Sequence, residues 1–395
     1  MNTEIDRIKV FLKQGYDLYI YGTGLWGRNV YHELRKQQIP IIGFVVTKKE
    51  NIEKLFELTI FEYFELEHKK VLLVLGLNKH NTKEVVDYLK MNHFDNERIF
   101  YSDTILGISD VRCGYDEVPC LDITTKIGCN VNCKYCPQDV LVNAYFEENK
   151  GRERYLSVDT LEKCMDHMPE NVNYQFGGMA EAFLNPDCLE LIRTVCKTKH
   201  TVNLYTTLVG VTEDMLYEII DLPIDYVTLH VADIKGYAKI PATDEYYRLL
   251  EIAVNAKKKN GNRFIDMCNS QAEPDPYVSD ICEGKYIITS TLLDRAGNLQ
   301  GDRLVSKCIK TGRISCGICG KALNKNELMP DGTLLLCCMD YGMKHVLGNL
   351  KEQSYSEIMK GTEMKRVKEG MEINFEDDIL CRSCSSANLI DWCKE

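Results

Sequence analysis

The first 105 residues alternate between short apolar stretches and amphipathic stretches, which is the pattern of an α/β domain. The apolar stretches are rich in β-branched and aromatic residues, so they predict buried strands. Because strands that alternate with helices pair in parallel, we expect a small parallel sheet over residues 1–105. Strands are expected at residues 17–21, 41–46 and 71–75, and helices at residues 29–36 and 82–91.

The same alternation resumes on a larger scale between residues 115 and 303. Successive strand–helix units of this kind build (β/α) barrels, which usually have eight strands. Only six strands are predicted here, so we expect a partial (β/α)6 barrel, with Ser157 as the cap of its first helix. Strands are expected at residues 121–125, 172–176, 202–206, 226–231, 263–267 and 286–290, and helices at residues 161–167, 188–197, 213–220 and 245–258.

The strand–helix pattern ends near residue 304, and cysteines and turn signals such as Pro330-Asp331-Gly332 replace it. We therefore expect a third, small and cysteine-rich domain over residues 304–395. No fixed-period repeat is present.

Composition and charge narrow the range of partners. The chain of 395 residues carries 48 Lys and Arg against 59 Asp and Glu, a net charge of −11, which disfavours nucleic acid and anionic membranes. The N-terminus has no signal-peptide pattern, and no apolar window approaches the ~20 residues needed to span a bilayer. We expect a cytoplasmic protein. Since thiols stay reduced there, the 18 cysteines indicate metal or redox chemistry, not disulfides.

Three cysteines follow the first barrel strand closely: Cys129, Cys133 and Cys136, in C-x3-C-x2-C spacing. A structural zinc ion would need four tight protein ligands, and no fourth cysteine lies nearby. A cubane iron–sulfur cluster also has four metal corners. Three thiolates would leave one iron open to a small molecule.

This cysteine motif, with Tyr135 as the aromatic residue before the last cysteine, resembles that of the radical S-adenosylmethionine (SAM) superfamily. The resemblance implies that the three cysteines hold a [4Fe–4S] cluster whose open iron binds S-adenosylmethionine (AdoMet). It also implies that an electron from the cluster cleaves AdoMet to a 5′-deoxyadenosyl radical, which abstracts hydrogen from a substrate. The position agrees, because catalytic groups of such barrels follow the carboxyl ends of strands.

Two further motifs resemble AdoMet-binding segments of the same superfamily. Gly177, Gly178 and Glu181 resemble its glycine–glycine–glutamate motif, although Met179 and Ala180 separate the glycines from the acid. Thr206 and Thr207 stand where relatives carry polar residues near AdoMet. The resemblance implies that these residues, with Tyr135, contact the cofactor; an ordinary strand–helix turn and an ordinary strand end are the alternatives.

Strand alternation predicts a polar barrel interior. If the apolar residues of each strand face the helices, the alternate, polar residues face inward. Buried polar groups without hydrogen-bond partners are costly, so this interior predicts a pocket for a polar substrate. His230 and Asp266 are our candidate proton acceptors or substrate ligands, with a structural pair as the alternative. The expected interior set is Asp122, Thr124, Asn173, Gln175, Asn203, Tyr205, Tyr226, Thr228, His230, Asp266 and Cys268.

The C-terminal cysteines resemble the auxiliary-cluster domains called SPASM or twitch, which follow many radical SAM cores. The likeness lies in a cysteine before Gly332, the G-x4-C step to Cys337, and a final C-x2-C pair. It implies one further, fully protein-bound [4Fe–4S] cluster. Cys316 is an alternative ligand, Cys308, Cys338 and Cys393 are spare, and structural zinc is the alternative metal. The implied ligands are Cys319, Cys337, Cys381 and Cys384.

A glycine-rich turn, Gly22-x-Gly24-x-x-Gly27, follows the first strand of the chain. A dinucleotide site also needs an acid at the end of the second strand, and none precedes Glu50, so NAD binding is not expected. The segment resembles Rossmann-like head domains of enzymes of surface-polysaccharide pathways, and a scaffold role is the alternative. The expected fold class is thus α/β: a Rossmann-like domain, a partial radical SAM barrel and a small iron–sulfur domain.

The sequence is compatible with three functions. The first is a radical SAM oxidoreductase that oxidises a small polar substrate, such as a sugar or an aminocyclitol, to a ketone. It would take electrons from a flavodoxin- or ferredoxin-type donor. The second is a peptide-modifying maturase, and the third is a non-catalytic iron–sulfur redox protein, which would leave the polar interior and Glu181 unexplained.

Overall fold

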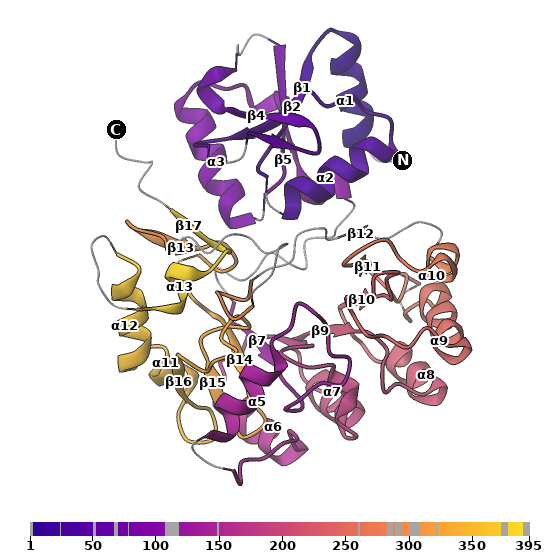
Figure 1. Ribbon diagram of the computed structural model, residues 1–395, viewed down its shortest axis with the longest axis vertical. Helices are drawn as coiled ribbons and strands as arrows, with labels where there is room; N and C mark the ends of the chain where they lie inside the picture. Colours follow the sequence, from indigo (N-terminus) through magenta and orange to yellow (C-terminus); the bar gives the residue numbers. More distant parts are fainter. Residues whose placement is uncertain are drawn as a thin grey trace. The chain divides into compact units, whose positions relative to one another are not determined.

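The computed structural model describes residues 3–23, 25–49, 53–66, 70–77, 79–106, 118–147, 150–259, 261–282, 287–288, 294–299, 309–320, 322–372 and 378–389. The chain forms two compact units, residues 1–113 and 114–395, which are described separately (Figure 1). Within the described residues, no helix combines the length and the apolar character needed to cross a membrane.

The first unit is a sheet covered by helices on both faces. Its strand order is β3-β4-β2-β1-β5-β6, and every pair is parallel except β3 with β4. The order in which the strands are added to the sheet switches from one side of β1 to the other between β4 and β5, as in doubly wound folds. The predicted Rossmann-like domain is confirmed. Its elements are α1 (Thr3–Lys13), β1 (Asp17–Tyr21), α2 (Leu25–Lys36), β2 (Gly43–Val46), β3 (Lys54–Leu55), β4 (Leu58–Glu62), β5 (Val71–Leu75), α3 (Lys79–Met91), β6 (Ile99–Tyr101) and α4 (Ser102–Leu106).

The glycine-rich turn after β1 has a steric explanation. Gly22 has a φ of +107°, in the region that favours glycine, and a Cβ on Gly27 would overlap the Gly22 carbonyl oxygen. These glycines therefore let α2 pack closely against β1. Gly24 and Glu50 lie outside the described residues.

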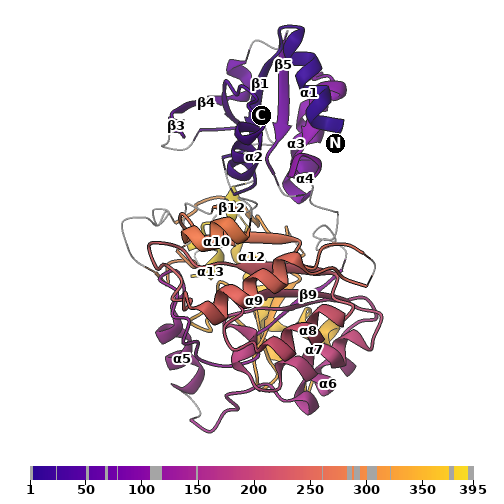
Figure 2. The same ribbon diagram turned by 90° about the vertical axis from the view of Figure 1, so that its right-hand side faces the viewer.

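The second unit contains the predicted six parallel strands, β7 to β12 in sequence order across the sheet. Helices follow the strands and gather on one face (Figure 2). Ser157 caps α6, because its hydroxyl accepts the Thr160 amide at 3.1 Å. The elements are β7 (Cys120–Ile123), α5 (Gln138–Glu147), α6 (Val158–Asp166), β8 (Asn173–Phe176), α7 (Cys188–Cys196), β9 (Thr201–Thr206), α8 (Glu213–Asp221), β10 (Tyr226–His230), α9 (Asp244–Asn255), β11 (Met267–Ser270), α10 (Pro276–Ile281) and β12 (Ile287–Ile288).

The fifth barrel strand differs from the prediction. It spans Met267–Ser270, not residues 263–267, and the register pairs His230 with Asn269. Parallel neighbours present the same face, so Met267 and Asn269 take the inward positions. Cys268 instead packs in the core between the sheet and the helices, and its predicted inward position is wrong. Successive side chains of a strand point to opposite faces, so an assignment that is wrong for one residue is wrong for all the others in that strand.

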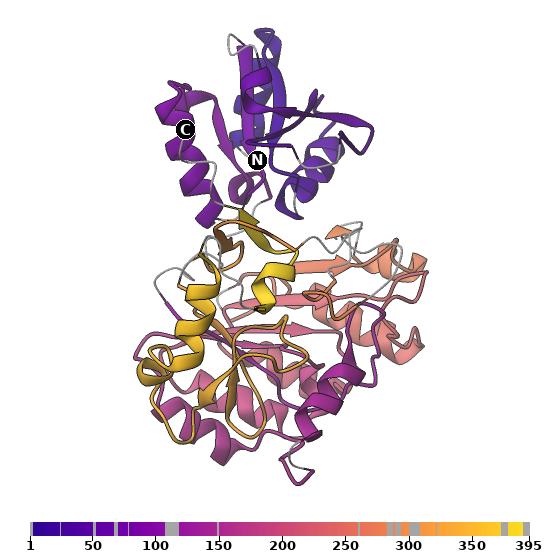
Figure 3. The ribbon, with the colours of Figure 1, turned by 60° about the vertical axis from the view of Figure 1, so that its left-hand side comes forward.

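The C-terminal segment joins the barrel sheet directly. Strand β14 pairs in parallel with β7, and β15 and β16 continue the sheet in antiparallel fashion to nine strands (Figures 1 and 3). A separate two-stranded sheet joins β13 to β17. The elements are β13 (Ile314–Cys316), β14 (Lys325–Leu328), β15 (Thr333–Leu335), β16 (Val346–Asn349), α11 (Tyr355–Ile358), α12 (Thr362–Gly370), α13 (Leu380–Ser383) and β17 (Ala387–Leu389).

Candidate functional site

The three-cysteine motif lies in the loop that leaves the carboxyl end of β7 and leads into α5. Burial is the main cause that raises the pKa of Cys133 to about 12, and the neighbouring thiols of Cys136 and Cys129 add to it. Burial also raises the pKa of Cys129. The thiols therefore lie close enough to interact electrostatically. Metal ligation would offset the cost of their negative charge in this partly buried loop.

The thiol of Cys136 has two hydrogen-bonding neighbours. Gln138 donates from Nε2 to the Sγ atom at 3.0 Å and to the Met179 carbonyl at 2.6 Å. The hydroxyl of Tyr341 lies 3.2 Å from the same sulfur. Polar groups directed at a ligand sulfur are typical surroundings of an iron–sulfur cluster.

The structure brings Glu181, Thr206 and Thr207 together. One carboxylate oxygen of Glu181 accepts the Thr206 hydroxyl at 2.7 Å. The other accepts the Thr207 amide at 2.6 Å and the Thr207 hydroxyl at 2.7 Å. Burial raises the pKa of Glu181, whereas these donors lower it. The result is a buried, firmly oriented carboxylate near the cysteine loop, suited to an ammonium group.

Gly177 and Gly178 leave β8 beside this carboxylate. Gly177 has a φ of +141°, and a Cβ there would lie 2.5 Å from the Cβ of Tyr205. A Cβ on Gly178 would overlap Glu327 Oε1 and would lie 2.6 Å from Thr124 Oγ1. The glycines are therefore required by close approach of the chain, which also leaves backbone groups accessible to a ligand.

One layer of polar side chains crosses five strands of the barrel. The pairings place Glu327 beside Asp122, Asp122 beside Gln175, Gln175 beside Asn203, and Asn203 beside Tyr226. All five are buried, while alternate residues of the same barrel strands pack with the helices. The five residues, called the interior layer below, therefore face inward. The predicted polar interior is thus present on β7 to β10.

The interior layer carries two neighbouring carboxyl groups. Lys325 Nζ lies 3.6 Å from Asp122 Oδ2, and Thr124 donates to Glu327 Oε1 at 2.5 Å. Burial is the main cause that raises the pKa of Glu327 well above its usual range, and the charge of Asp122 adds to it. Burial also raises the pKa of Asp122, against the effect of Lys325. Burial therefore favours the protonated form of both carboxyl groups.

The two residues predicted as proton acceptors lie at different ends of the sheet. His230 ends β10 at the carboxyl end, where active sites of such barrels form. Asp266 precedes β11, accepts the Val227 amide at 2.9 Å and pairs with Lys258 at 2.8 Å. The prediction that Asp266 faces the interior with His230 is wrong. Strand β11 begins at Met267, one residue after Asp266, so this carboxylate lies at the amino end of the sheet.

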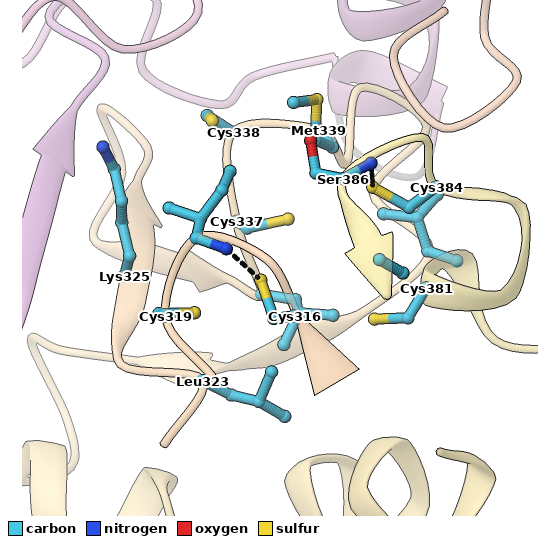
Figure 4. A pocket seen from close by; sticks show the side chains of 14 residues that line it. Cys316, Cys319, Leu323, Lys325, Cys337, Cys338, Met339, Cys381, Cys384 and Ser386 are labelled. Carbon is cyan, nitrogen blue, oxygen red and sulfur yellow. Dashed lines mark hydrogen bonds between the residues drawn. The ribbon is translucent and has the colours of Figure 1, made fainter. Parts of the chain in front are cut away.

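Six cysteines of the C-terminal segment line one cavity (Figure 4). Four are the predicted ligands Cys319, Cys337, Cys381 and Cys384, and the other two are Cys316 and Cys338. Backbone amides approach two of the sulfurs: Ile318 donates to Cys316 at 3.5 Å, and Ser386 donates to Cys384 at 3.4 Å. Cys338 points away from the other sulfurs in Figure 4. Cys308 and Cys393 lie outside the described residues.

Cys316 and Cys319 interact closely, since a hydrogen bond between them is the largest cause that raises the pKa of Cys319. A cubane needs four ligands, so either thiol can complete the set. We expect Cys316→Ala and Cys319→Ala each to retain about eight iron atoms per chain after anaerobic reconstitution, and the double variant to lose about four. Cys338→Ala is the control and should retain the full content. Loss of four iron atoms in the Cys316→Ala protein alone would show that its thiol is indispensable.

The residues present fit iron–sulfur clusters. Among the described residues, no group of three His, Cys, Asp or Glu side chains is arranged to hold a single metal ion. The donors are thiols set in apolar surroundings with amides directed at the sulfurs, which is the chemistry of a cubane.

Comparison with protein families identifies two segments of the chain. Residues 123–269 match the family described as the radical SAM superfamily. Residues 319–385 match SPASM, described as an iron–sulfur cluster-binding domain. No curated protein matches the chain.

Several solved structures are similar to the chain at low identity. BtrN in complex with AdoMet and 2-DOIA has 15% identity and a TM-score of 0.47, covering 69% of this chain and 94% of that one. Native anSMEcpe with AdoMet and a peptide has 15% identity, coverages of 67% and 86%, and a TM-score of 0.37. SuiB of Streptococcus suis bound to its precursor peptide has 13% identity and a TM-score of 0.43, covering 90% of this chain and 80% of that one. Likeness of this degree carries no information about substrate.

Proposed function

The chain combines a radical SAM domain with a SPASM iron–sulfur domain, and from this we propose that it oxidises a small polar substrate by AdoMet-dependent radical chemistry. When bound, the clusters and AdoMet supply an electron that cleaves the sulfonium bond, a 5′-deoxyadenosyl radical that abstracts a hydrogen atom, and an acceptor for the electron left on the substrate. The protein's own residues then have to bind, orient and deprotonate the substrate.

The cofactor-binding roles rest on residues that the structure gathers at the carboxyl end of the sheet. Cys129, Cys133 and Cys136 would hold the AdoMet-binding cluster. Glu181, kept in place by Thr206 and Thr207, would accept the ammonium group of AdoMet. Gly177, Gly178 and Tyr135 would line the same site.

The interior layer is the observation that carries the substrate assignment. Gln175 Oε1, Asn203 Oδ1 and Glu327 Oε2 are buried and have no hydrogen-bond partner among the described residues. A buried polar atom without a partner is costly, so a ligand rich in hydroxyl or amino groups fits here better than an apolar one. Loss of hydrogen from a carbinol also releases a proton. His230 and the carboxyl groups of the layer are the candidate acceptors.

Substrate-dependent formation of 5′-deoxyadenosine tests this proposal. The reconstituted, reduced protein should form more 5′-deoxyadenosine with members of a panel of sugars and aminocyclitols than with short peptides, and deuterium from a labelled carbinol carbon should appear in the product. Asn203→Leu should lower the stimulated rate at least about tenfold, because a buried partner of the substrate is lost. Stimulation by peptides alone would overturn the proposal. A gene for a precursor peptide next to the gene for this protein would also favour peptide modification over oxidation of a small molecule.

A further inference from the structure

The turn that follows the auxiliary-site ligand Cys337 reaches the other cluster site. Four residues after Cys337, the hydroxyl of Tyr341 lies 3.2 Å from Cys136 Sγ. Tyr341 is buried, and its turn is closed by the Asp340 amide, which donates to the Cys337 carbonyl at 3.0 Å. The predicted ligands of the two clusters are thus joined by five consecutive residues and one hydrogen bond.

We propose that Tyr341, supported by Arg295, sets the reduction potential of the AdoMet-binding cluster, an inference that rests on the cluster assignment above. A cysteine bound to iron is a thiolate and has no proton to give. The hydroxyl of Tyr341 must then be the donor and Cys136 the acceptor. Hydrogen bonds to ligand sulfurs and nearby charges are two of the factors that set the potentials of such clusters.

Arg295 adds a positive charge beside this hydrogen bond. Its Nε donates to the Tyr135 carbonyl at 3.3 Å, and its guanidinium carbon lies 5.9 Å from the centre of the Tyr341 ring. None of the ion pairs between described residues includes Arg295. Its charge therefore remains available to a thiolate-ligated cluster, which is negative.

Both groups favour the reduced cluster, which carries one more electron than the oxidised one. A donor to the thiolate and a nearby cation each stabilise the more negative state, so both raise the potential. Tyr341 is therefore a positioning residue that acts through Cys136. Because its turn also carries Cys337, ligation at the auxiliary site would hold the donor in place.

Tyr341→Phe tests the inference, since it removes only the hydroxyl. The midpoint potential of the AdoMet-binding cluster, measured by redox titration followed by electron paramagnetic resonance, should shift to a more negative value. The signal belongs to this cluster if added AdoMet changes it, because the protein-saturated auxiliary cluster has no open iron. Iron content should stay at about eight atoms per chain.

Tyr145→Phe is the matched control. Tyr145 is a buried tyrosine of the same apolar cluster and also lies beside an arginine, with Arg152 Cζ 4.1 Å from its ring. Its hydroxyl donates at 2.7 Å to the Glu153 carbonyl, not to a thiol. This variant should leave the potential unchanged. Equal potentials in the parent and Tyr341→Phe proteins would overturn the inference.

Arg295→Gln provides a second measurement, in case the tyrosine variant folds poorly. It should shift the potential in the same direction, because it removes the charge and leaves Tyr341 in place. Failure of the two proposals can be told apart. If the parent protein shows no AdoMet-sensitive signal, the cluster assignment fails; if that signal is present and neither variant moves its potential, only the role of Tyr341 and Arg295 fails.

Discussion

Replacement of Cys129, Cys133 and Cys136 together by alanine is expected to abolish formation of 5′-deoxyadenosine. The variant should keep about four of about eight iron atoms per chain, because the auxiliary thiols lie elsewhere in the sequence and remain intact. The reason is coordination: without three thiolates there is no cluster with an open iron, and AdoMet has neither an anchor nor an electron source. Iron analysis and product chromatography under anaerobic conditions measure both effects.

Cys196→Ala is the control for this experiment. Cys196 ends α7 in a partly buried position, and it belongs to neither group of thiols. It should keep full iron content and activity. Continued cleavage of AdoMet in the triple variant would contradict the assignment, as would loss of all iron with the fold intact.

Gly178→Ala is expected to have the second-largest effect. The added methyl group would overlap Glu327 Oε1 and crowd Thr124 Oγ1, both of which are buried. Overpacking of this kind costs typically about 1–3 kcal/mol and displaces the chain. Because Glu181 follows three residues later, the carboxylate that we propose binds AdoMet would move as well. The dissociation constant for AdoMet should rise at least about tenfold, which corresponds to about 1.4 kcal/mol.

Gly342→Ala offers a comparison at a position with space. A Cβ there would meet nothing closer than 3.8 Å, and no positive φ strains the substitution. Thermal unfolding and calorimetric titration with AdoMet should both match the parent protein. The explanation based on crowding would be refuted if Gly178→Ala bound AdoMet as tightly as Gly342→Ala does.

Local patterns were enough to predict most of the barrel. Alternation placed Asp122, Gln175 and Asn203 on the inner face, because each strand also has a clear apolar face. It failed on β11, where Phe264 and Ile265 look like strand residues but precede the strand. The consequence was a wrong location for Asp266, since parity and strand end both depend on where the strand begins.

The most informative partners could not be predicted from local sequence. Glu327 reaches Thr124 across 203 positions, and Tyr341 reaches Cys136 across 205. Both contacts exist because β14 pairs with β7, a pairing between short strands that no spacing rule indicates. A domain boundary at residue 304 places Glu327 and Lys325 outside the barrel, so the interior predicted from the sequence lacks them.

The pairing of β14 with β7 also limits how this protein can be dissected. Strand β14 lies within the SPASM match, and β7 leads directly into the radical SAM match, so cutting the chain between the two matches would leave β7 as an open edge. It would also take away Glu327, which supports the glycine turn. The two segments match separate families, yet they share one compact unit and one sheet. Exchanging the C-terminal part between relatives would therefore also replace Lys325 and Glu327 beside the barrel strands.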